Sequence, residues 1–136
     1  MSQEVSIVRC SGQALEQYIP DLAQLRIEVF RDFPYLYDGD LAYEENYLQT
    51  YTRCQQAVIV LALDGNKIIG ASTGIPMQYE SEEFILPFAA HGYDPKKVFY
   101  CAESVLKKHY RGLGLGVRFF EERENHAREL GIRYKF

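Results

Sequence analysis

The chain has 136 residues, of which 47% are apolar and 25% are charged, a balance typical of one soluble globular domain and not of a disordered chain. No apolar run approaches the roughly 20 residues that cross a bilayer, and residues 1–4 lack the basic patch and apolar core of a signal peptide. Cys10, Cys54 and Cys101 are widely spaced and form neither a disulfide framework nor a zinc pattern. We therefore expect a cytoplasmic protein with no membrane contact and no metal.

The net charge of −4 is unevenly distributed along the chain. Residues 1–95 carry 14 acidic and 5 basic side chains, whereas residues 96–136 carry 10 basic and 5 acidic ones. The basic part suits an anionic ligand and the acidic part a cationic partner, although solvated surface charge explains the division equally well.

Hydrophobic periodicity and turn residues predict elements in the order β-α-α-β-β-(α)-β-α-β. This order indicates a mixed sheet with helices on its faces. The strands are expected at 4–9, 57–63, 67–74, 98–106 and 132–136, and the helices at 20–32, after residue 40, at 81–90 and at 115–130.

Two amphipathic helices are expected in the first half of the chain. The first carries apolar residues at helical spacing, and Phe33-Pro34 ends it. Asp40 is placed to cap the second, whose tyrosine stripe we expect in the core rather than in a site. The apolar positions are Leu22, Leu25, Val29 and Phe30 in the first helix, and the stripe is Tyr43, Tyr47 and Tyr51 in the second.

The second half of the chain begins with Ala57–Leu63, an apolar run that predicts a strand buried on both faces. Ser81 is expected to cap a short helix, and Pro87 makes the second half of that helix doubtful. For the last helix the predicted apolar face is Val117, Phe120 and Ala127, with Gly131 as its C-terminal glycine.

A glycine-rich stretch, Tyr110–Gly116, lies between the strand at 98–106 and the last helix. A strand that turns through glycines into a helix N-terminus directs backbone N–H groups and the positive end of the helix dipole at an anion. A Walker P-loop is rejected because Val117-Arg118 follows Gly116 instead of a lysine–hydroxyl pair. A dinucleotide fingerprint fits poorly, since its third glycine would fall on Val117 or Phe119.

The motif Arg/Gln-x-x-Gly-x-Gly/Ala is met by the residues from Arg111 to Gly116. With the early helix pair, the hairpin at Asp64-Gly65-Asn66 and the helix after the glycines, the chain resembles the GNAT superfamily of acyl-CoA-dependent N-acetyltransferases. The resemblance implies an α/β (α+β mixed sheet) GNAT-like acyl-CoA N-acyltransferase fold. It also implies that residues 1–136 form one such domain, truncated after its fifth strand and so C-terminally incomplete.

The resemblance further implies that acetyl-CoA is the cosubstrate, without a metal. Backbone N–H groups of the glycine turn would hold the pyrophosphate, and Arg111 would add charge, unless it is only a surface residue. Backbone groups of Val105 and Leu106 would bond the pantetheine. The turn residues implied are Gly112, Leu113, Gly114, Leu115, Gly116 and Val117.

Glu103, in the middle of the strand at 98–106, is the candidate general base. An alkylammonium must lose a proton before it attacks a thioester, and family members often use a carboxylate for this. A structural glutamate bonded to a neighbouring helix or tyrosine is the alternative. By resemblance, the acetyl group passes directly to the amine in a ternary complex.

For the acceptor, the resemblance points to the loop that carries Tyr35, Tyr37 and Asp38, whose rings and carboxylate suit a cationic amine. A packed aromatic loop with exposed acids is weighed equally. The expected partner is a small-molecule or peptide amine, with no nucleic acid and no membrane, and a homodimer could cover the open sheet edge.

Three functions follow from these observations. The first is an N-acetyltransferase. The second is a non-catalytic acyl-CoA-binding module or defective remnant, and the third is a nucleotide-binding domain unrelated to coenzyme A.

Overall fold

The computed structural model describes residues 5–32, 35–36 and 38–135. In that part of the chain five strands form one sheet in the order β1-β2-β3-β4-β5. The first four strands are antiparallel, and β5 pairs in parallel with the start of β4. The strands are β1 (Val5–Cys10), β2 (Val58–Asp64), β3 (Lys67–Pro76), β4 (Val98–Leu106) and β5 (Tyr134–Lys135).

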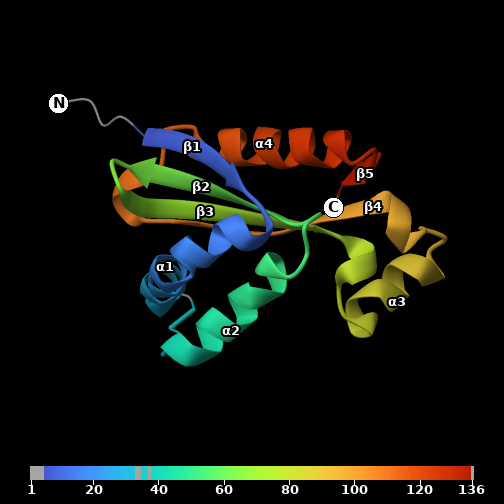
Figure 1. Cartoon of the computed structure of the whole chain (residues 1–136), viewed down its shortest axis with the longest axis horizontal. Coiled ribbons are helices and arrows are strands. Elements are labelled where there is room, and N and C mark those ends of the chain that lie inside the picture. Colours follow the sequence, from blue (N-terminus) through green and yellow to red (C-terminus); the bar gives the residue numbers. More distant parts are fainter. Residues whose placement is uncertain (1–4, 33–34, 37, 136) are drawn as a thin grey trace.

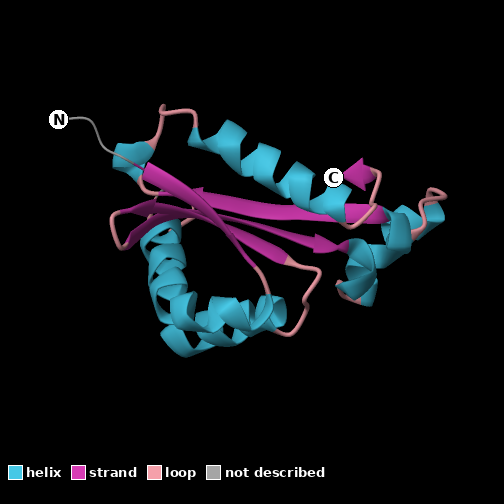
Figure 2. Ribbon diagram, turned by 45° about the horizontal axis from the view of Figure 1, so that its top comes forward, coloured by secondary structure: helices cyan, strands magenta, loops and turns pink. Residues whose placement is uncertain are grey.

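Helices cover both faces of this sheet (Figures 1 and 2). α1 and α2 lie against one face and α4 lies along the other, while α3 stands beside the start of β4. The order of elements agrees with the prediction, with short 3-10 turns added between them. The helices are α1 (Ile19–Arg31), α2 (Leu41–Thr52), α3 (Glu82–Ala90) and α4 (Leu115–Glu129).

The core consists of two apolar layers separated by the sheet, and β2 belongs to both. Ile59 and Leu61 pack with α1 and α2, whereas Val58, Val60 and Ala62 pack with α4. Successive side chains of a strand point to opposite faces, so an unbroken apolar run fills both layers. The prediction of a strand buried on both faces is confirmed.

The N-terminal helix pair forms as its local sequence indicates. Pro20 occupies the first turn of α1, and Leu22 and Leu25 are buried. Asp40 caps α2, because its Oδ1 accepts hydrogen bonds from the backbone N–H groups of Ala42 at 2.9 Å and Tyr43 at 3.4 Å. The predicted cap is confirmed.

The apolar face of α4 differs from the prediction. Ala127 is buried as expected, but Val117 and Phe120 are exposed, at 63% and 48%. The buried positions are spaced four residues apart, and this stripe lies against the sheet. They are Leu115, Phe119, Arg123 and Ala127.

Three further predictions are corrected in part. Of the tyrosine stripe, Tyr51 is buried in the core and Tyr47 packs against it, but Tyr43 is 62% exposed. Pro87 lies inside α3, which continues to Ala90. Ser81 stands at the N-cap of α3, although its side chain makes no capping hydrogen bond to the described part of the chain.

Candidate active site

The glycine turn before α4 has the backbone conformation that its sequence indicates. Gly112 and Gly114 have φ values of 80° and 78°, in the left-handed region that side chains disfavour. Gly114 is the N-cap of α4 and offers no side chain to the first backbone N–H groups of the helix. Leu115 is buried and anchors the turn, whereas Arg111 and Leu113 are exposed.

Gly116 is different, because the folded chain itself gives no reason for a glycine there. Its φ is not positive, and a Cβ atom at this position would meet no heavy atom of the described residues within 4 Å. The first turn of α4 also carries no acidic side chain. The backbone N–H groups at the start of the helix are therefore open to an anion that approaches over Gly116.

β4 contains a bulge at the position that matters for the candidate base. Thr73 pairs with Glu103 and the next residue, Gly74, pairs with Cys101, so Ala102 is the extra residue of β4. The bulge resets the alternation of side chains. Tyr100 packs on the α1–α2 side and Cys101 on the α4 side. Tyr100 and Glu103 can therefore face the same space.

That space is a cavity of about 400 Å³ between α2, the start of α3 and β4. Its volume is within the range of small-ligand sites, and its wall combines aromatic rings with two carboxylates. Burial, together with the negative charge of Glu80, raises the pKa of the Tyr100 hydroxyl. The lining residues are Tyr47, Thr50, Tyr51, Tyr79, Glu80, Ser81, Phe84, Tyr100, Ala102 and Glu103.

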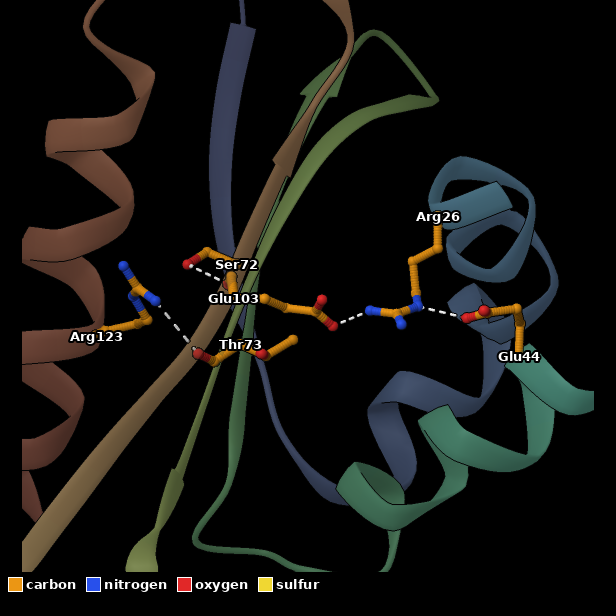
Figure 3. A network of polar contacts seen from close by, with 6 residues as sticks. All are labelled: Arg26, Glu44, Ser72, Thr73, Glu103 and Arg123. Atoms are coloured by element: carbon orange, nitrogen blue, oxygen red, sulfur yellow. Dashed lines mark hydrogen bonds and ion pairs between the residues drawn. The ribbon is translucent and has the colours of Figure 1, made fainter. Parts of the chain in front are cut away.

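Behind this wall, Arg26 of α1 bridges two carboxylates (Figure 3). Its Nε donates to Glu44 Oε2 at 2.5 Å, and its Nη1 donates to the carboxylate of Glu103. The guanidinium also lies 4.6 Å from the ring centroid of Tyr47 and 5.2 Å from that of Phe30. Glu44 is only 1% exposed, so the bridge crosses the interior between the helix pair and β4.

Sequence reasoning did not pair Arg26 with Glu44, although a signal was present. Arg26 lies four residues after Leu22, and Glu44 lies four residues before Leu48, so each charge shares the buried stripe of its helix. Two opposite charges on the apolar stripes of adjacent helices indicate a buried pair. Only the packing of the two helices against β4 adds Glu103 as the third member.

The described residues of the loop predicted to hold the acceptor do not line the cavity. Tyr35 is 64% exposed, and its ring packs edge-on against Phe30 with 5.1 Å between centroids. Asp38 is exposed, and Tyr37 lies outside the described residues. A role for this loop in acceptor binding stays a prediction.

The outer edge of β4 is open where the strand approaches the glycine turn. Val105 and Leu106 pair with Ala71 and Gly70 of β3 on one side. On the other side, the described strands pair with β4 only at residues 98 and 99. Main-chain groups of β4 near Val105 and Leu106 therefore have no strand partner on that side among the described residues.

The described part of the chain shows neither a metal-binding cluster nor a helix able to span a membrane. No group of three or more His, Cys, Asp or Glu side chains in the described part of the chain could hold a metal ion. Nor is any helix within residues 5–32 or 38–135 both long enough and apolar enough to cross a bilayer.

Comparison with known sequences identifies the family. The sequence model of the acetyltransferase (GNAT) family matches residues 20–136. The chain belongs to the GNAT acetyltransferase family. This confirms the predicted resemblance, and the mixed sheet with helices on both faces confirms the predicted fold class. No curated protein matches the chain in sequence.

Solved GNAT structures share this fold at low sequence identity. An aminoglycoside acetyltransferase from an uncultured soil metagenomic sample, solved with trehalose, has a TM-score of 0.63 and 18% identity, over 97% of this chain and 75% of that one. An aminoglycoside N-acetyltransferase solved with CoA has a TM-score of 0.64 and 14% identity, over 99% of this chain and 76% of that one. A ribosomal-protein-alanine N-acetyltransferase from Brucella melitensis has a TM-score of 0.64 and 16% identity, over 93% of this chain and 69% of that one.

Proposed function

We propose that this GNAT protein transfers an acetyl group from acetyl-CoA directly to an amine, with Glu103 as the general base. The observation that carries the proposal is the course of β4. The strand lines a ligand-sized cavity at Tyr100 and Glu103, and it ends at Leu106 just before an open anion cradle. One strand therefore joins an acceptor space to a cofactor space.

Acetyl-CoA fits the residues of the cradle. The backbone N–H groups from Gly112 to Val117 would hold the pyrophosphate, because Gly116 leaves the approach clear. Arg111 is exposed beside them and adds positive charge. Val105 and Leu106 would bond the pantetheine through the open edge of β4. When bound, acetyl-CoA would supply a thioester: the amine nitrogen forms a C–N bond to the acetyl carbon, the C–S bond breaks, and coenzyme A leaves as its thiol.

The chain's own contribution to the chemistry is proton transfer and positioning. An alkyl amine has a pKa of about 10 and reaches the site mostly as its ammonium ion. Glu103 takes a proton from the nitrogen, which frees the lone pair for attack. No side-chain nucleophile is needed, because the amine attacks the thioester itself.

The cavity favours a cationic acceptor. Rings of Tyr47, Tyr79 and Tyr100 line it together with the carboxylates of Glu80 and Glu103, and aromatic faces and carboxylates both attract an ammonium group. The amine acceptors named for the structural neighbours, aminoglycosides and a ribosomal-protein alanine, support an amine without choosing among its kinds.

Turnover tests the function against the alternative of a non-catalytic acyl-CoA-binding module. The protein is incubated with acetyl-CoA and a panel containing an aminoglycoside, a polyamine, an arylalkylamine and an alanine-terminated peptide, and free thiol is followed. We expect thiol release that depends on one amine class. Saturable acetyl-CoA binding without thiol release from any amine, both in this chain and in a C-terminally extended form, would favour the binding module.

The base assignment makes a sharper prediction. Glu103→Gln should lower kcat at neutral pH by about 10²- to 10⁴-fold while acetyl-CoA affinity changes little, because the side chain lies in the acceptor cavity and not in the glycine turn. Glu80→Gln, in the same cavity, should raise KM for the amine without this loss of kcat. A pH–rate profile that is unchanged in Glu103→Gln would contradict the assignment.

A further inference from the structure

We infer that Arg26 and Glu44 are positioning residues for Glu103. Arg26 orients the Glu103 carboxylate, and Glu44, which binds the same guanidinium, weakens the attraction of Arg26 for the candidate base. The inference rests on the proposed function, since it gives Glu103 its catalytic role. Neither Arg26 nor Glu44 lines the cavity, so both act through Glu103 and not on the substrate.

The geometry fixes the direction of the Glu103 side chain. Arg26 lies between the two carboxylates, with Nε bonded to Glu44 and Nη1 bonded to Glu103 (Figure 3). The side chains of Arg26 and Glu44 are 14% and 2% exposed, and the rings of Phe30 and Tyr47 flank the guanidinium. A guanidinium held on several sides presents its remaining N–H groups in one direction, and this orients the carboxylate that accepts from it.

The charges explain why a second carboxylate is useful. A carboxylate paired with a guanidinium alone is stabilised in its charged form and is a weak proton acceptor. Glu44 is a second anion on the same cation, and its negative charge offsets part of the pull of Arg26 on Glu103. The arrangement keeps Glu103 in place without the full loss of basicity that a simple ion pair would cause.

Other groups that face Glu103 act on it from different elements. Tyr47 and Tyr51 reach the cavity from α2, Tyr100 from β4, and Tyr79 and Glu80 from the segment before α3. Glu80 is the other carboxylate among the lining residues, and its negative charge favours a protonated Glu103. These groups remain in every variant below, so they do not contribute to the differences.

The test follows the carboxyl carbon of Glu103 by ¹³C NMR during a pH titration, with Glu103→Gln used to assign the signal. Glu44→Gln keeps the shape of the buried side chain but removes its charge, so the titration midpoint of Glu103 should fall by about one pH unit. Arg26→Met combined with Glu44→Gln should instead raise the midpoint by about one unit or more. The double variant avoids a buried Glu44 without a partner.

Glu45→Gln is the matched control, because it removes the same charge from the next residue of α2, whereas Arg26 pairs with Glu44 and Glu103. Opposite shifts in the two test variants with little change in the control support the inference. Equal shifts in Glu44→Gln and Glu45→Gln, or no shift in the double variant, would overturn it.

Kinetics separate this inference from the proposed function. With one amine throughout, the acid limb of kcat/KM should move in the same direction as the NMR midpoint in each variant. If the midpoints move as expected but Glu103→Gln leaves the rate profile unchanged, the base assignment fails and the positioning of the carboxylate stands. If Glu103→Gln removes the acid limb but the midpoints stay fixed, the positioning inference fails.

Discussion

The three glycines of the turn have different physical roles. Gly112 and Gly114 adopt left-handed backbone angles, so the chain needs them in order to turn. Gly116 lies in a helix with open space above it. Glycine weakens a helix relative to alanine, so Gly116 costs the fold stability, and we propose that access of the ligand to the backbone is what favours it.

Gly116→Ala should therefore move stability and binding in opposite directions. The free energy of unfolding should rise by up to about 1 kcal/mol, and acetyl-CoA affinity should fall because the methyl group occupies the approach to the backbone N–H groups. Urea unfolding and a thermal shift with acetyl-CoA measure the two effects. Gly92→Ala is the control, because Gly92 has a φ of 88° and open space around it. This variant should be less stable but should bind acetyl-CoA with unchanged affinity. Unchanged affinity in Gly116→Ala would contradict the cradle.

Residues of the site differ in how far the sequence reveals them. The glycine motif is local, because six consecutive residues set the backbone of the turn. The bridge from Glu44 through Arg26 to Glu103 joins α1, α2 and β4, and residues 26 and 103 are far apart in the chain. The buried stripes of the two helices indicate the first pair, but only the packed sheet brings Glu103 to it.

At the scale of elements, two of the described α-helices begin after an Asp or Ser suited to capping, and only α2 uses it. Asp40 accepts from two backbone N–H groups of α2, whereas the side chain of Ser81 makes no such bond to the described residues. A favourable residue type fixes the position of a helix start, but a capping bond also requires the side-chain rotamer that the surrounding loop allows.

Asp40→Ala and Ser81→Ala should therefore lower the free energy of unfolding by different amounts. Asp40→Ala should lower the free energy of unfolding by about 1 kcal/mol, since two N–H groups of α2 lose their acceptor. Ser81→Ala should change it far less. Urea unfolding curves with unchanged slopes check both values, and a loss in Ser81→Ala as large as that in Asp40→Ala would contradict the difference.

Tertiary packing also selected among faces that the sequence left open. The start of α4 has apolar residues around most of its circumference, so two stripes were available. The sheet buries the one with Leu115 and Phe119 and leaves Val117 and Phe120 exposed. In β4 the extra residue Ala102 turns Tyr100 to the same side as Glu103, a change that no alternating pattern predicts.

At the scale of the whole molecule, the sheet buries several weak acids along with its apolar layers. Burial raises the pKa of Tyr51 above its ordinary value of 10.0, and does the same for Tyr100, Cys10 and Cys101. For Tyr110, the hydrogen bond to Asp64 at 2.5 Å is the main cause of a raised pKa. Each of these groups is harder to ionise in the folded chain than in the unfolded one.

Alkaline pH should therefore destabilise the protein. A group whose pKa is higher in the folded state contributes its full share of folding stability below its unfolded-state pKa, which is 9.0 for cysteine and 10.0 for tyrosine. That stability is lost as pH rises beyond these pKa values. Tyr51→Phe keeps the ring in the core but removes the hydroxyl, so stability should fall less steeply above pH 10. Urea unfolding between neutral pH and pH 11 tests this, with the exposed Tyr43→Phe as control. Equal slopes in both variants would contradict it.

The sequence by itself determined the order of elements, the two-faced burial of β2, the cap of α2 and the glycine turn of a GNAT protein. All of these depend on residues close together in the chain, through periodicity, backbone angles and hydrogen bonds within a few positions. The tertiary structure decided the buried face of α4, the bulge at Ala102, the cavity and the charge bridge from Glu44 to Glu103. These depend on which surfaces meet when helices pack on a sheet, and such contacts join residues that no local pattern connects.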